Sequence, residues 1–448
     1  MSIPFGFAPG GDSNDDNNQL ADMLENMGRM LRNGGQGQTG SVNWDSARAA
    51  ARQAISTAGD SPASQSDLEV ISAAANLADL WLNDATALPS TGHTIAAVTR
   101  NEWLESTFES WKVIVEPVAE GMSSAMTGLM PSEGMPGTLE IPEEFLAGLP
   151  DEVAANLRET LASTDFASIA GPLMSMAKSM GATMFGTQFG QALGATSQEV
   201  LSNSDVGIPL ASTGTSGLVT SNVSAFIKGL SVDEKDAWIY IALRELAHQR
   251  LFAAAPWIQS QLLAAIGDYA RGVRIDTAQI EQAMTQIDPN NPESIGELMS
   301  ADLFEPTQTP EQELALARIE LLLALIEGWV TQVVTLAAAS RLPASAALEE
   351  VFRRRRASGG PAEKLFAGLI GLEIRPRRLR EASNLWGRLS ETKGVEVRDG
   401  LWAHPDLLPR GEDIDDIDAF IAQGDLDLMA ELNKAIESGS TDDPEDSA

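Results

Sequence analysis

Apolar residues recur mostly three and four positions apart along much of the chain, which is the spacing of an amphipathic helix. The first such region runs from residue 42 to about 128 and ends at a Pro- and Gly-rich segment, 131–150, which predicts a connecting loop. Further helices are predicted over 166–200, 233–255 and 310–340. The pattern therefore predicts a mainly α-helical protein.

Residues 206–227 break the helical pattern, because β-branched residues cluster there between turn signals. This segment predicts two short strands and hence a small sheet, which makes the fold class α+β. In the helix that follows, Ser231 and Glu234 have the spacing of a capping box, so we expect the helix to open there.

Two side-chain patterns within the predicted helix 166–200 indicate how that helix packs. Glycines recur there mostly every four residues, at Gly181, Gly186, Gly190 and Gly194. Such a stripe lets another backbone approach closely, and we interpret it as packing in a soluble core rather than as a membrane dimer motif. The methionines of this helix, including Met180 and Met184, are likewise interpreted as packing residues rather than as a partner groove.

Composition divides the chain into three parts. Residues 1–40 are rich in Gly, Asn, Asp and Ser and predict a flexible N-terminal arm, 41–410 form the helical domain, and 411–448 form an acidic tail. The tail holds thirteen acidic groups and Lys434, a local charge of −12. Residues 353–380 are the opposite, with nine basic and two acidic groups, a local charge of +7.

The overall composition excludes several classes of function. The chain has no Cys, so disulfides, zinc ribbons, iron–sulfur clusters and Cys nucleophiles are excluded. Only three His are present, which limits imidazole-rich metal sites. The net charge of −34 makes nucleic acid an unexpected partner.

The location expected for the chain is the cytoplasm. No secretory signal pattern stands at the start of the sequence. The apolar stretch 321–340 is long enough to span a membrane, but Glu327 near its centre is costly there. We therefore expect a buried helix and no membrane partner.

One constellation carries candidate chemistry, the sequence Arg244-Glu245-Leu246-Ala247-His248. In the zincin motif H-E-x-x-H, two imidazoles one helical turn apart bind zinc, and the Glu activates the attacking water. Here Arg244 replaces the first His, and a guanidinium has no lone pair to offer a metal. Taken alone, the five residues favour an ordinary amphipathic helix in which His248 is a core residue and Arg244 pairs with a nearby acidic group.

Longer stretches carry a resemblance to a known family. The stretches LRELAHQRLFAAAPWI, FGTQFGQALGATSQEVL, LLLALIEGWVTQVV and GLEIRPRRLREASNLW resemble an actinobacterial zincin-like family of zinc-dependent metalloproteases or hydrolases. The resemblance implies a zincin-like fold of many helices and a small sheet over about 40–410. Within it, 41–200 is a helical layer, 201–345 the zincin core with the degenerate motif helix, and 346–410 the basic C-terminal part.

The resemblance assigns roles to particular residues. Glu245 corresponds to the general base and His248 to the second zinc-ligating His of the motif. Members of the family often have Glu-Gly-His on a downstream helix, where this chain has Glu327-Gly328-Trp329. If zinc is retained, His248 and Glu327 are therefore the expected ligands. Arg244 and Trp329 stand where the two missing imidazoles are expected.

From these departures we predict a metal-free pseudo-peptidase that acts as a binding or scaffold protein for an unknown protein or peptide partner. Arg244 is expected to bridge Glu245 and Glu327 in place of the metal. Trp329 is expected to fill the volume of the lost imidazole, and extended peptide to bind along a sheet edge near residues 217–224.

Two alternatives stay open. The first is an active zinc-dependent metallopeptidase or hydrolase with unusual ligands, in which His93 or His404 completes the site. The second is an anion-binding protein that uses Arg353 to Arg380, although we expect acidic residues of the same chain to neutralise that segment.

Overall fold

The structure is a computed structural model, in which the described residues are 40–92, 94–128, 166–211, 216–272, 309–361, 364–365, 367 and 378–422. The predicted loop 131–150, nearly all of the predicted N-terminal arm and most of the predicted acidic tail lie outside these residues.

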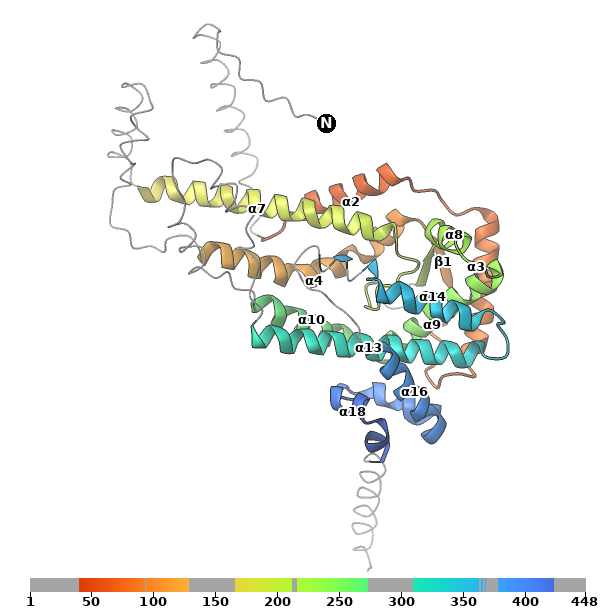
Figure 1. Cartoon of the computed structure of the whole chain (residues 1–448). Coiled ribbons are helices and arrows are strands. Elements are labelled where there is room, and N and C mark those ends of the chain that lie inside the picture. Colours follow the sequence, from red (N-terminus) through yellow and green to blue (C-terminus); the bar gives the residue numbers. More distant parts are fainter. Residues whose placement is uncertain are drawn as a thin grey trace, which may run out of the picture.

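The described part of the chain is mainly helical, as predicted (Figure 1). Its helices are α2 (Trp44–Ala58), α3 (Gln65–Leu82), α4 (Arg100–Gly128), α7 (Phe166–Ser197), α8 (Thr220–Lys228), α9 (Glu234–Ala254), α10 (Trp257–Arg271), α13 (Pro310–Ala338), α14 (Ser345–Ala357), α16 (Leu379–Lys393), α17 (Val395–Gly400) and α18 (Gly411–Asp415). Two short 3-10 helices, η2 (Leu401–Ala403) and η3 (Pro405–Leu407), follow α17.

The small sheet consists of two parallel strands, β1 (Ile95–Val98) and β2 (Ser216–Val219). The prediction of two strands within 206–227 was therefore wrong in detail, because β2 pairs with a strand about 120 positions earlier and α8 follows at once. The other edge of β2 is occupied too: the amide of Asn203 donates to the Gly217 carbonyl, and that of Val219 to the Leu201 carbonyl. The edge expected to bind peptide near 217–224 is therefore already paired.

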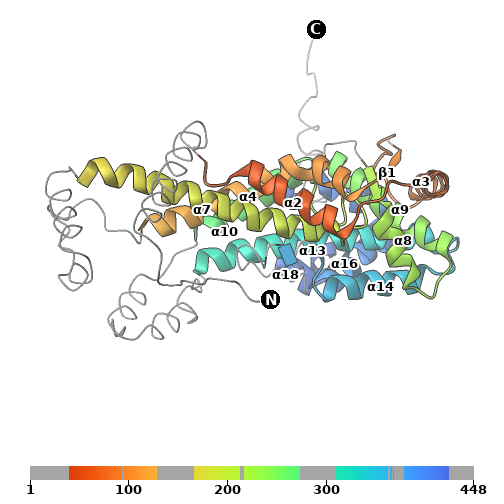
Figure 2. The ribbon, with the colours of Figure 1, turned by 90° about the horizontal axis from the view of Figure 1, so that it is seen from above.

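Helices α2 and α7 lie side by side along one face of the molecule (Figures 1 and 2). An added Cβ at Gly186, Gly190 or Gly194 would come within 3 Å of the α2 backbone or of Ala54. The interpretation of the glycine stripe as close helix packing is confirmed at these three positions. The fourth, Gly181, has open space beside it.

The two methionines of α7 whose side chains are described do not pack inside. Met180 is 71% exposed and Met184 is 60% exposed. The interpretation of these two residues as packing residues was wrong, because each lies two positions from the buried Ala182 and so projects from the opposite side of α7.

Helix α9 runs through the centre of the molecule, packed against α3, α13 and α14 (Figure 1). Every residue from Tyr240 to Leu251 is buried, including the charged ones. The side chain of Asp233 caps the helix by accepting a hydrogen bond from the Lys235 amide, so the helix begins later than the Ser231 spacing predicted.

Helix α13 lies beside α9 and α10, and its ends match the prediction. Thr309 and Gln312 form a capping box at its start. It is the one described helix long and apolar enough to cross a membrane, but 72% of its apolar window is buried inside the protein. Its apolar character is thus explained by packing.

The last described elements cover one side of α13. Helix α16 packs on α13, and Gly328 permits the contact, since an added Cβ there would come within 2.8 Å of Ala382 and Ser383. Helix α18 lies within the range predicted as acidic tail. It packs on α16 through the buried Ile414 and an ion pair between Arg378 and Asp415.

Candidate functional site

The degenerate motif of α9 faces Glu327 of α13 in the interior. The Arg244 Nη2 atom lies 2.6 Å from Glu327 Oε2, and His248 Nε2 lies 3.0 Å from Glu327 Oε1. Arg244 and His248 are four residues apart, so both project from the same face of α9. The structure thus brings together three of the residues singled out in the sequence.

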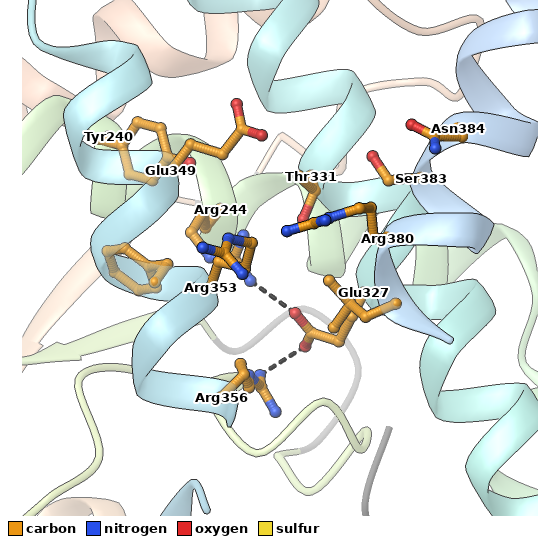
Figure 3. A pocket seen from close by; sticks show the side chains of 12 residues that line it. Tyr240, Arg244, Glu327, Thr331, Glu349, Arg353, Arg356, Arg380, Ser383 and Asn384 are labelled. Carbon is orange, nitrogen blue, oxygen red and sulfur yellow. Dashed lines mark hydrogen bonds and ion pairs between the residues drawn. The ribbon is translucent and has the colours of Figure 1, made fainter. Parts of the chain in front are cut away.

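A second guanidinium reaches the same carboxylate from α14. Arg356 Nη2 lies 2.5 Å from Glu327 Oε1 and also donates to the Asp205 carbonyl. Figure 3 shows Arg244 and Arg356 approaching Glu327 from different helices. Burial alone raises the pKa of Glu327, but Arg356, His248 and Arg244 together hold the pKa of this carboxyl well below its usual range.

The imidazole of His248 is held between two oxygen atoms. Its Nδ1 atom lies 2.8 Å from the Arg244 carbonyl oxygen, and its Nε2 atom lies 3.0 Å from Glu327 Oε1. The ring nitrogen that would bind a metal therefore faces a carboxylate that two guanidinium groups already contact.

Glu245 is buried beside this cluster but is held by neutral donors. It accepts hydrogen bonds from the Ser204 amide, the Ser216 hydroxyl and the Gln249 side chain, each at 3.1 Å. The expectation that Arg244 bridges Glu245 and Glu327 was therefore wrong. Adjacent residues project about 100° apart on a helix, so the two side chains leave α9 in different directions.

The loop after α7 closes the site from another side. Asp205 accepts from both terminal nitrogens of Arg355 at 2.8 Å. Burial raises the pKa of Asp205, but Arg355 and then Arg356 lower it, so its pKa lies below the usual range. Gly207 has a φ of +77°, and an added Cβ there would lie 3.0 Å from Glu327 Oε1.

The charges of this interior balance within the protein. Three cations, Arg244, Arg355 and Arg356, lie among the three carboxylates Asp205, Glu245 and Glu327, with His248 beside them. A zinc ion needs three protein ligands in a catalytic site. In the described part of the chain, no group of three or more His, Asp or Glu could hold a metal ion. These residues do not fit zinc.

Comparison with known proteins identifies the scaffold. The sequence profile of the family described as zincin-like metallopeptidase matches residues 42–421. The chain belongs to this family. The match spans most of the chain, including α9 and its motif.

A solved structure shares the fold. It comes from Chloroflexus aurantiacus, is named as a presumed hydrolase with a novel fold, and has a TM-score of 0.55 and 19% sequence identity to this chain. The alignment covers 86% of this chain and 99% of that one. At this identity the likeness shows a shared fold alone. None of the curated proteins matches the chain.

Trp329, the second expected replacement of a family imidazole, lies in a different cluster from Glu327. Glu327 and Trp329 are two residues apart on α13, so their side chains project about 200° apart. The Trp329 indole donates to Asp399 at 2.8 Å and packs edge-on against Trp402. Asp399 is also held by the buried Arg398. The expectation that Trp329 fills the volume of a lost ligand beside Glu327 is therefore not met.

Of the two other histidines, His404 is described by the structure, and it lies at the surface rather than in the buried cluster of Glu327. His404 lies between η2 and η3, where its Nδ1 accepts from the Asp406 amide and its side chain is 62% exposed. His93 lies outside the described residues.

The four consecutive arginines that open the basic segment are neutralised inside the chain, as expected. Arg353 and Arg354 pair with Glu350, Arg355 with Asp205, and Arg356 with Glu327. The contact of Arg356 with Glu327 was not predicted from the sequence. The sequence marks Arg356 only as the last of four consecutive arginines, three residues after Arg353 on a helix. This position does not indicate which carboxylate Arg356 contacts.

Proposed function

We propose that this chain is a metal-free pseudo-peptidase of the zincin-like metallopeptidase family, which keeps the fold and serves as a binding or scaffold protein. The observation that carries this proposal is the contact of Arg244 with Glu327 at 2.6 Å. In this arrangement a fixed cation occupies the position of the first zinc-ligating His and neutralises a carboxylate that would otherwise repel its neighbours.

The hydrogen bonds of Glu245 support the proposal as well. A general base must reach a water molecule held near the substrate. The carboxylate of Glu245 is fully buried and accepts three hydrogen bonds from Ser204, Ser216 and Gln249. It therefore serves to anchor β2 and the loop after α7 to α9.

We further propose that the partner is a protein or peptide and that the chain works in the cytoplasm. The edge of β2 is already paired, so we place the partner contact elsewhere than on this edge. The mostly buried α13 supports a protein that is not anchored in a membrane by that helix.

Restoring the motif tests the proposal. We expect Arg244→His, which creates H-E-x-x-H beside Glu327, to gain zinc binding, and the gain to increase when Arg356→Gln also removes the second cation. Arg244→Gln is the matched control, because it removes the same charge without adding a ligand. Zinc per chain is measured by mass spectrometry after dialysis against zinc. Zinc binding by the unaltered protein at the level of Arg244→His would contradict the proposal.

A further inference from the structure

A pocket of about 210 Å³ lies directly beside the Arg244–Glu327 pair, between α9, α13, α14 and α16 (Figure 3). Its lining includes four arginines, from three helices, and two glutamates. The arginines are Arg244, Arg353, Arg356 and Arg380. The lining therefore carries an excess of two positive charges, within a chain whose net charge is −34.

Three of the four arginines that line the pocket form ion pairs with carboxylates. Glu327 pairs with Arg244 and Arg356, and Glu350, which lies outside the lining, pairs with Arg353. Arg380 has no ion-pair or hydrogen-bond partner among the described residues and projects toward the pocket from α16 (Figure 3). It lies in the first turn of α16, where the helix dipole also favours an anion.

Tyr240 gives an independent sign of a missing ligand. Its side chain lines the pocket one helical turn before Arg244, and the residue is only 1% exposed. Its hydroxyl is buried, and the neighbouring hydrogen-bonding group is the Arg244 guanidinium, which can only donate, so the phenol proton has no acceptor within the described part of the chain. A buried donor without an acceptor costs free energy, and a ligand oxygen in the pocket would accept this proton.

The phenol stays a donor at every physiological pH. Burial raises the pKa of Tyr240 to about 12, although the Arg244 guanidinium beside it acts in the opposite direction. The side chains of Thr331, Ser383 and Asn384 add hydroxyl and amide groups to the same lining.

We propose that this arginine pocket binds a small ligand through a carboxylate or phosphate group, with Arg380 and Tyr240 as the groups that contact it. Guanidinium groups bind both oxyanions by charge-assisted hydrogen bonds. A small anion fits better than a polyanion, because the cations line a recess of limited volume and most of the basic segment is paired within the protein. This inference names the ligand class of the binding protein proposed above. It rests on that proposed function in one respect, that no metal is bound beside Arg244.

Titration calorimetry of the full chain tests the pocket, with inorganic phosphate and succinate as separate probes and sodium chloride as the control for ionic strength. We expect saturable binding of at least one probe. Arg380→Gln should weaken it about tenfold, the effect of losing one charge-assisted hydrogen bond, and Tyr240→Phe several-fold. Arg388→Gln, on the same helix but outside the pocket lining, should leave it unchanged.

A spectroscopic measurement at neutral pH follows the phenol itself. The chain has only two tyrosines, so in a Tyr269→Phe background the tyrosine absorbance reports Tyr240 alone. An oxyanion that accepts the hydrogen bond of this phenol should shift its near-ultraviolet absorbance, and sodium chloride should not.

Three results would overturn the inference: no saturable binding of either probe, equal weakening by Arg388→Gln, or binding only of a DNA oligonucleotide, which would indicate a polyanion surface. The metal content of the same preparation separates the two proposals. Zinc in the unaltered protein contradicts the pseudo-peptidase, whereas absent anion binding in zinc-free protein contradicts the pocket alone.

Discussion

Glu327 is the residue on which the interior of this protein depends most. It is 2% exposed, its two oxygens accept from Arg244 and Arg356, and the His248 ring lies 3.0 Å away. Removing one partner of a buried ion pair leaves the other charge uncompensated, which costs roughly 3–5 kcal/mol. The same carboxylate also links stability to pH.

We predict that Glu327→Gln lowers stability at neutral pH and flattens its decline in acid. The pKa of Glu327 is depressed in the folded protein, so its contribution is present above the unfolded value of 4.5 and is lost as the pH falls below that value. Urea unfolding from pH 7 to pH 3 measures both effects. The exposed Glu199→Gln is the control and should keep the steeper decline of the unaltered protein. An equally steep decline in Glu327→Gln would contradict the assignment.

At the residue scale, the sequence predicted part of this site. The incomplete motif singled out Arg244 and His248, and the resemblance to the family singled out Glu327. They could not show that Arg356 completes the cluster or that Glu245 binds neutral donors instead. Those contacts come from a loop 41 positions before Glu245 and from α14, 29 positions after Glu327, and the periodicity within one helix does not show which other segments pack against it.

At the scale of elements, the helices were predicted well and the sheet was not. Periodicity within one segment locates a helix, whereas β1 and β2 pair across about 120 residues, and four-residue strands leave little local signal. The glycine stripe of α7 was informative because it recurs inside one helix. The packing of this stripe against α2 can be tested by substitution of one glycine that contacts α2 and one, on the same helix, that does not.

We predict that Gly190→Ala destabilises the protein by about 1–3 kcal/mol, because the added Cβ would lie 2.1 Å from the Ala47 carbonyl oxygen and force α2 and α7 apart. Gly181→Ala, on the same helix with open space around it, should be neutral or stabilising by up to ~1 kcal/mol, since alanine favours helix. Thermal unfolding of both variants checks the pair. Equal effects at the two positions would show that α7 does not pack through its glycines.

At the scale of the whole molecule, the family fold surrounds an interior rich in paired charges. The family profile covers residues 42–421, and α9 and α13 pack together within it. Between them and α14, arginines are paired with carboxylates. This internal group of cations lies in a chain whose net charge is strongly negative. We propose that the pocket beside it binds a small anionic ligand.

The proposal of a metal-free pseudo-peptidase is tested most directly by the amount of metal in the unaltered protein, purified without chelator and measured together with peptide hydrolysis. We expect zinc far below one ion per chain and no hydrolysis that depends on Glu245. Stoichiometric zinc, with peptidase activity that Glu245→Gln abolishes, would contradict it.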